Sequence, residues 1–186
     1  MKSRFVFVIF AVFLLLTDCK KEKTVNEPQK ESVKIKISWE NKDFPLSMEI
    51  YEPAAQRSFQ IWETAVANKK DLPVSAKIDG DEFYIKRGGK KLFILVMHNN
   101  TKETQRFFAA PHSAEPAEYS FGFKFKCLCV NHAFSILPDG YWYRVVELRL
   151  SEKFAGNAIE IKHNLIGISE ARMQEIEKNM DSHEME

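Results

Sequence analysis

The chain has 186 residues, a length that suits one domain with short appendages. Its 27 Lys and Arg residues nearly balance 26 Asp and Glu residues, and the two kinds are interleaved. Nucleic-acid binding needs Lys and Arg clustered on one face, so no nucleic-acid partner is expected. The three cysteines are an odd number, which argues against a disulfide framework: Cys19, Cys127 and Cys129.

An export signal is expected in residues 1–19. A short basic start precedes an unbroken apolar run from Phe5 to Leu16, which has the form of a signal peptide. The run is too short to span a bilayer, because a spanning helix needs about 20 apolar residues. Cys19 ends a Leu-Thr-Asp-Cys sequence that resembles a lipobox, so acylation of Cys19 is predicted. The alternative is a short membrane anchor in which Cys19 has no role. Both place the rest of the chain in the cell envelope, membrane-tethered on the periplasmic or extracytoplasmic side.

The next segment, residues 20–32, is polar and charged and is expected to be a flexible tether. The pattern then changes, because apolar and polar residues alternate from Val33 to Trp39 as in a half-buried strand. Similar short runs follow, including the almost wholly apolar Lys91 to His98, with turn signals such as Pro138-Asp139-Gly140 between them. Short strands without a βαβ pattern predict an all-β, immunoglobulin-like sandwich over residues 33–168.

Three further segments have sequence patterns that differ from these strands. The apolar residues of 54–68 fit a helical spacing, but β-branched residues blur the pattern, so a helix there is not established. Residues 119–130 are expected to form one strand with four aromatic side chains on a shared face: Tyr119, Phe121, Phe123 and Phe125. Residues 169–186 are expected to form a short helix followed by a polar tail.

Cys127 and Cys129 are the residues that indicate chemistry. In a strand, residues two apart lie on the same face with Cβ atoms about 6–7 Å apart. This spacing is too wide for an easy disulfide, whose Cβ atoms are about 3.8 Å apart, but both thiols can turn toward one soft ion. Thiolates favour Cu(I), which needs two or three ligands, whereas Zn²⁺ needs four. Copper as Cu(I) is therefore the predicted cofactor. The alternatives are buried, inert cysteines and a transient redox pair.

Two histidines near the cysteines are candidate auxiliary ligands. His132 follows Cys129 by three residues and reaches the metal if the chain bends at Asn131. His112 lies in an Ala-Pro-His-Ser loop that is expected to face the same region of the chain. The predicted metal site therefore consists of Cys127 and Cys129, with His132 and His112 as further ligands.

The order of these features resembles a known family, the copper-delivering assembly factors of cytochrome c oxidase (CtaG type). The matching stretches lie between Leu72 and Ile168: Leu72-Pro73, Lys86 to Thr101, Pro111 or Pro116, Tyr119 to Val130, Pro138-Asp139-Gly140 and Ile159 to Ile168. The resemblance implies Cu(I) bound by Cys127 and Cys129, an oxidase subunit as copper acceptor, and a homodimer that shares copper between protomers. Leu128 and Val130 stand where the family has phenylalanine.

No catalytic motif is recognisable, so the protein is not expected to be an enzyme. The residues favour an envelope copper-binding protein that handles copper and passes it to a copper acceptor. The resemblance implies, more specifically, a Cu(I) chaperone for respiratory oxidase assembly with an oxidase subunit as partner. One alternative is a cupredoxin-like electron-transfer protein with mixed Cys and His ligands. Another is a lipoprotein whose sandwich binds a protein partner without metal.

Overall fold

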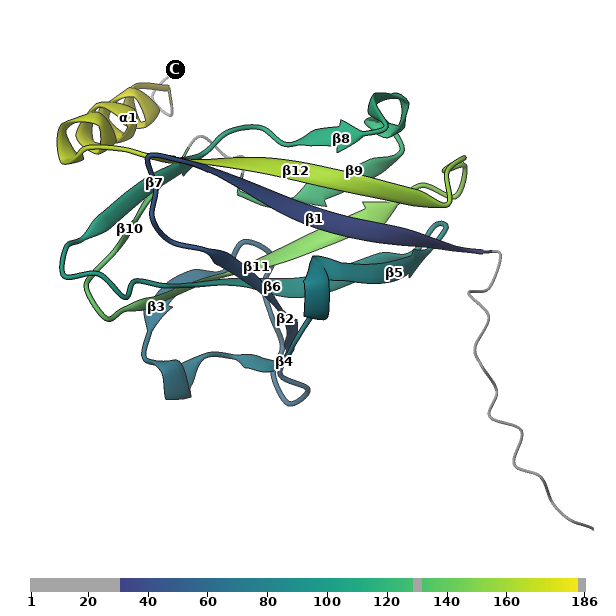
Figure 1. Cartoon of the computed structure of the whole chain (residues 1–186), viewed down its shortest axis with the longest axis horizontal. Helices are drawn as coiled ribbons and strands as arrows, with labels where there is room; N and C mark the ends of the chain where they lie inside the picture. Colours follow the sequence, from purple (N-terminus) through teal and green to yellow (C-terminus); the bar gives the residue numbers. More distant parts are fainter. Residues whose placement is uncertain (1–30, 129–131, 184–186) are drawn as a thin grey trace, which may run out of the picture.

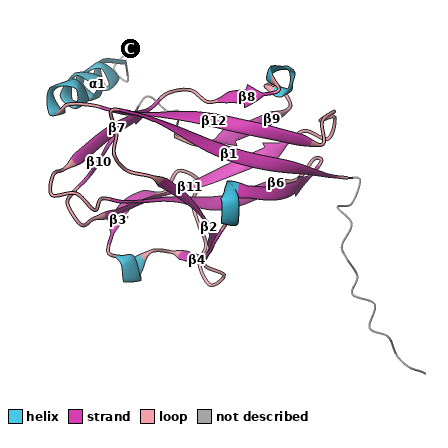
Figure 2. Ribbon diagram, in the orientation of Figure 1, coloured by secondary structure: helices cyan, strands magenta, loops and turns pink. Residues whose placement is uncertain are grey.

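The computed structural model describes residues 31–128 and 132–183, and these form two β-sheets packed face to face (Figures 1 and 2). The strands of the first sheet are, in spatial order, β10 (Ala133–Ile136), β7 (Gln105–Ala109), β12 (Ala158–Gly167), β1 (Ser32–Lys42) and β5 (Glu82–Lys86), and β8 (Ser113–Glu115) also pairs with β12. The strands of the second sheet are β3 (Thr64–Ala67), β11 (Tyr141–Leu150), β6 (Lys90–His98), β2 (Met48–Pro53) and β4 (Val74–Lys77), and β9 (Phe123–Lys126) also pairs with β11.

The core lies between the two sheets and follows the alternation that the sequence predicts. In β1, the apolar residues Val33, Ile35 and Ile37 are at most 1% exposed and belong to the same buried cluster as Phe93 of β6. Each such fully buried apolar side chain contributes roughly 1.5–3 kcal/mol. The predicted all-β sandwich is therefore confirmed, and its arrangement is compatible with an immunoglobulin-like fold.

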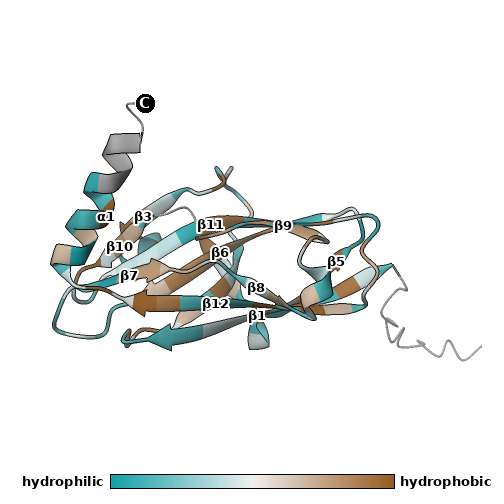
Figure 3. Ribbon diagram, turned by 90° about the horizontal axis from the view of Figure 1, so that it is seen from above, coloured by the Kyte–Doolittle hydropathy of each residue, from teal (hydrophilic) through white to brown (hydrophobic). Residues whose placement is uncertain are grey.

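The predicted C-terminal helix is also present, as α1 (Glu170–His183). Its start is set by Ser169, whose Oγ accepts a hydrogen bond from the backbone N–H of Arg172 at 3.2 Å, as an N-cap residue does. Figure 3 shows that α1 is mostly hydrophilic and projects from one end of the sandwich. An ion pair of 3.1 Å between Arg106 and Glu170 joins its first turn to β7.

One edge of β12 is interrupted halfway along its length. Residues 165–167 pair with β7 and residues 160–162 pair with β8, on the same side of β12. The chain between β7 and β8, residues 110–112, therefore passes beside His163 and Asn164 without regular pairing, and Ala110 donates its N–H to the carbonyl of Asn164 at 2.9 Å. His112 and His163 both lie at this interruption.

The same interruption occurs in the second sheet, on one edge of β11. Residues 141–144 pair with β3 and residues 147–150 pair with β9. Cys127 directly follows β9, so it leaves the sheet at the point where β9 ends and β3 begins. Each sheet therefore has a stretch of irregular backbone, one beside β12 and one beside β11. Side chains from both sheets come together at these stretches.

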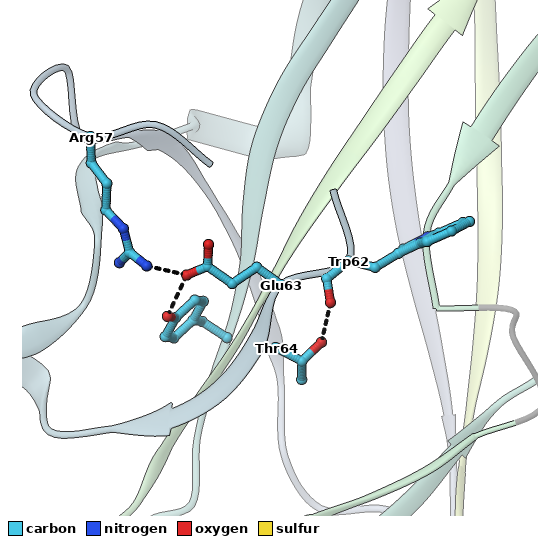
Figure 4. A network of polar contacts seen from close by, with 5 residues as sticks. Arg57, Trp62, Glu63 and Thr64 are labelled. Atoms are coloured by element: carbon cyan, nitrogen blue, oxygen red, sulfur yellow. Dashed lines mark hydrogen bonds and ion pairs between the residues drawn. The ribbon is translucent and has the colours of Figure 1, made fainter. Parts of the chain in front are cut away.

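Residues 54–68 contain no helix. The end of this segment forms β3, because residues 64–67 pair with β11. Trp62 has a positive φ of 70°, which turns the chain into the strand. Figure 4 shows the contacts that hold this turn: Arg57 forms an ion pair with Glu63, and the Thr64 hydroxyl donates to the carbonyl of Trp62 at 2.9 Å.

The expected strand over 119–130 is much shorter in the structure. Among residues 119–128, which the structure describes, only β9 (123–126) is a strand, and Tyr119 instead ends the 3-10 helix η3 (Ala117–Tyr119). The chain turns after Tyr119, because the N–H of Gly122 bonds to the Tyr119 carbonyl at 2.8 Å. As a result Phe121 is 99% exposed, while Phe123 and Phe125 pack against the core as expected.

The predicted signal in residues 1–19, with Cys19, and most of the predicted tether lie outside the described residues. Within the part of the chain that the structure describes, no helix is long and apolar enough to cross a membrane.

Candidate metal centre

The centre of the candidate site is Cys127, which is 2% exposed. Its Sγ lies 3.6 Å from Nδ1 of His112, which reaches the site from the loop between β7 and β8. His163 completes the group from β12 and is fully buried. One donor atom from each of these three residues lies within 4.8 Å of the other two, so the group could hold a metal ion.

Aromatic rings surround the two imidazoles and fix their planes. Trp39, the β1 partner of His163 in the parallel pair, stacks on it with ring centroids 5.0 Å apart. Phe125 contacts both histidines, with centroid distances of 5.7 Å to His112 and 5.4 Å to His163. Phe123 adds a further contact of 5.6 Å to His112. The donors therefore lie in a largely apolar enclosure, where charge interactions are stronger than in water.

A buried cation adjoins the thiol. Arg144 of β11 is 5% exposed, and its Nε donates to the backbone carbonyl of Cys127 at 3.2 Å. Its Nη1 donates to the hydroxyl of Thr64 at 2.7 Å, and its guanidinium lies 5.4 Å from the ring centroid of Phe134. Burial lowers the pKa of Arg144, and the charge of the Cys127 thiolate opposes that shift. Among the described residues, no carboxylate forms an ion pair with Arg144.

The structure brings together only part of the ligand set that the sequence predicts. Cys127 and His112 are in contact, whereas His132 is exposed before β10 and is not part of the three-residue group. Cys129 lies outside the described residues.

Sequence reasoning missed His163, although a signal for it exists. In β12 the inward positions are Ile159, Ile161, His163 and Leu165, which are all buried. His163 therefore lies at an inward-facing position of the strand, where the other inward-facing residues are apolar. Periodicity places it in the core, and only the interrupted edge of β12 brings His112 beside it.

The donor set has defined chemical preferences. A thiolate is a soft ligand that selects Cu(I) and Zn²⁺, and imidazole suits both copper oxidation states and zinc. Structural zinc sites are almost always four-coordinate, and the described residues supply three donors within 4.8 Å of one another. Two imidazoles and one thiolate are also the trigonal ligand set of electron-transfer copper sites.

Fold and side-chain group together define an all-β sandwich protein with a buried His/Cys group that could hold a metal ion. The chain belongs to the family described as Domain of unknown function (DUF8709), whose model matches residues 33–168. No curated protein gives a match to the chain.

Proposed function

We propose that this protein is a copper-binding protein of the cell envelope that holds Cu(I) at Cys127, His112 and His163. The observation that carries the proposal is the convergence of a buried thiol and two imidazoles within 4.8 Å. Three donors satisfy Cu(I), whereas zinc would need a fourth ligand. The proposal includes a role in copper handling or respiratory oxidase assembly, with an oxidase subunit or another protein as copper acceptor. It also includes a homodimer and a membrane tether through Cys19.

The charge of the surroundings supports the monovalent ion. One thiolate and Cu(I) cancel, so a Cu(I) centre with neutral imidazoles adds no net charge to the enclosure. A divalent ion would leave one positive charge there, close to the buried Arg144. Uncompensated charge in a low-dielectric interior is costly, so the site favours Cu(I) over divalent ions.

Electron transfer is the second candidate function, because the two imidazoles and one thiolate match a cupredoxin-type ligand set. The two candidates differ in a visible property. A cupredoxin-type centre loaded with Cu(II) is strongly coloured, whereas a Cu(I) chaperone is not expected to form a stable coloured Cu(II) state. The absorption spectrum after Cu(II) loading distinguishes them.

The proposal is tested by copper stoichiometry. The reduced chain from residue 20 onward, which contains every described element, is loaded with Cu(I) against a competing chelator. We expect about one copper per chain, lost in Cys127→Ser because the only soft donor of the group is removed. His98→Ala is the matched control, since His98 is an exposed imidazole that stacks on Tyr141 at 4.1 Å, away from the group. Equal copper retention by wild type and Cys127→Ser would refute the site.

A further inference from the structure

Phe121 is the most exposed large apolar side chain of the described residues, at 99%. The turn that carries it is well fixed, because Tyr119 packs on Phe154 with ring centroids 4.9 Å apart. Two backbone hydrogen bonds of the adjacent Gly122 add to this: its N–H donates to the Tyr119 carbonyl at 2.8 Å, and its carbonyl accepts from the Ser151 N–H at 2.9 Å. The fold therefore exposes the Phe121 side chain to solvent on a turn whose backbone is fixed by hydrogen bonds.

A row of three cations crosses the outer surface of the second sheet next to this turn. Arg149 of β11 is the register partner of Lys124 on β9 and of Lys90 on β6. Like charges directly opposite one another in an antiparallel pair are destabilising. In the described part of the chain, Glu147 is the one carboxylate that forms ion pairs with this row: it pairs with Arg149 and lies 3.5 Å from Lys90. The hydrogen bond from Arg149 holds the pKa of Glu147 below its usual range.

The aromatic turn and the basic row border one shallow groove of about 330 Å³. Its walls combine apolar side chains with two cations: Phe121, Phe123, Leu150, Lys124 and Arg149. Among the described residues, no acidic side chain lines it. A surface with this combination suits an amphiphile that has an anionic head group and an apolar body.

The N-terminal segment enters the domain at the same end of the sandwich. The Glu31 carbonyl accepts from Arg87 in the turn between β5 and β6, and Lys34 donates to Asn157 just before β12. Gly156, next to Asn157, lies against the Tyr119 ring. Figures 1 and 3 both place the start of β1 at the end where these turns lie. The predicted lipid on Cys19 would therefore approach the domain from this end.

We infer that this end of the sandwich docks on an anionic lipid surface, with Phe121 in the interface and Lys90, Lys124 and Arg149 at the lipid phosphates. Apolar side chains such as Phe are buried at the boundary of head groups and acyl chains by proteins that lie on a membrane, and each basic residue near an anionic bilayer strengthens binding roughly fivefold. This contact does not depend on the copper site. It would orient the tethered domain, so that the opposite end, with α1 and the turn at Leu137, points away from the bilayer.

The test uses the unlipidated chain from residue 20 onward and sedimentation with vesicles. We expect binding to phosphatidylcholine vesicles that contain phosphatidylglycerol, little binding to phosphatidylcholine alone, and a loss of binding as salt rises, because salt screens exposed charges. Lys124→Glu should weaken binding about tenfold or more, since it reverses one of the three charges. Phe121→Ala should weaken it as well.

Two controls carry a charge reversal and an apolar truncation at the opposite end of the sandwich. Leu137→Ala removes another exposed apolar side chain, and Lys102→Glu reverses another exposed charge, so neither should alter vesicle binding. In Phe121→Trp, the indole fluorescence should shift to the blue with anionic vesicles. Binding that ignores lipid charge, absence of vesicle binding, or equal effects of the test and control variants would overturn the inference.

Discussion

Replacing His163 with leucine is expected to lower the Cu(I) affinity at least about a hundredfold, because it removes one of three converging donors. Changes to residues that only orient metal ligands already cost about 10–100-fold. Leucine has a similar volume and would pack against the apolar rings of Trp39 and Phe125, so the metal-free domain should keep its thermal stability. The affinity is measured by competition with a Cu(I) chelator, and folding by thermal unfolding without metal.

His132→Ala is the matched control for this substitution. His132 follows Cys129 closely in sequence, but it is exposed and is not part of the group that holds His163. We therefore expect His132→Ala to leave the Cu(I) affinity unchanged. A loss of affinity in His132→Ala, with none in His163→Leu, would show that the copper ligands lie around the 127–132 segment instead.

Replacing Arg144 with methionine is expected to weaken Cu(I) binding about tenfold and to lower the free energy of unfolding by about 1–2 kcal/mol. The stability loss arises because the Cys127 carbonyl loses its donor in a buried place. The affinity loss arises because Arg144 joins the backbone of Cys127 to β11 and so helps to fix the thiol. Both quantities are measurable on one preparation, by chelator competition and by denaturant unfolding.

Arg172→Met is the control for Arg144→Met, since Arg172 lies on α1 with a side chain 57% exposed. Surface substitutions of this kind usually change stability by less than about 0.5 kcal/mol. A copper affinity that is the same in Arg144→Met and in wild type would show that the buried guanidinium serves the fold only.

The sandwich was predictable from the sequence, because strands with one buried face have a two-residue period that a reader can see directly. Val33, Ile35 and Ile37 illustrate this. The same period misleads in residues 119–126. There Tyr119 and Phe121 continue the alternation of the strand, but the backbone turns between Tyr119 and Gly122. Phe121 therefore points into solvent, while Tyr119, Phe123 and Phe125 pack against the core. Periodicity does not report where a strand begins.

The candidate site was predictable in part, and the reason is sequence distance. The Cys-Leu-Cys motif indicates Cys127, and nearness in sequence favours residues such as His132 as its partners. His163 is 36 positions further along the chain, on a strand of the other sheet. Bringing it to Cys127 requires both interrupted edges, at β12 and at β11, and neither interruption has a signature in the sequence. Nothing in the 54–68 segment indicated β3 either, because its pairing depends on the edge that β11 offers.

X-ray absorption at the copper edge of the Cu(I)-loaded, reduced chain reports the ligands of the proposed centre. We expect one sulfur and two imidazole nitrogens around the copper, from Cys127, His112 and His163. Two sulfurs without imidazole would contradict this expectation, and would indicate that Cys127 and Cys129 hold the ion as a pair.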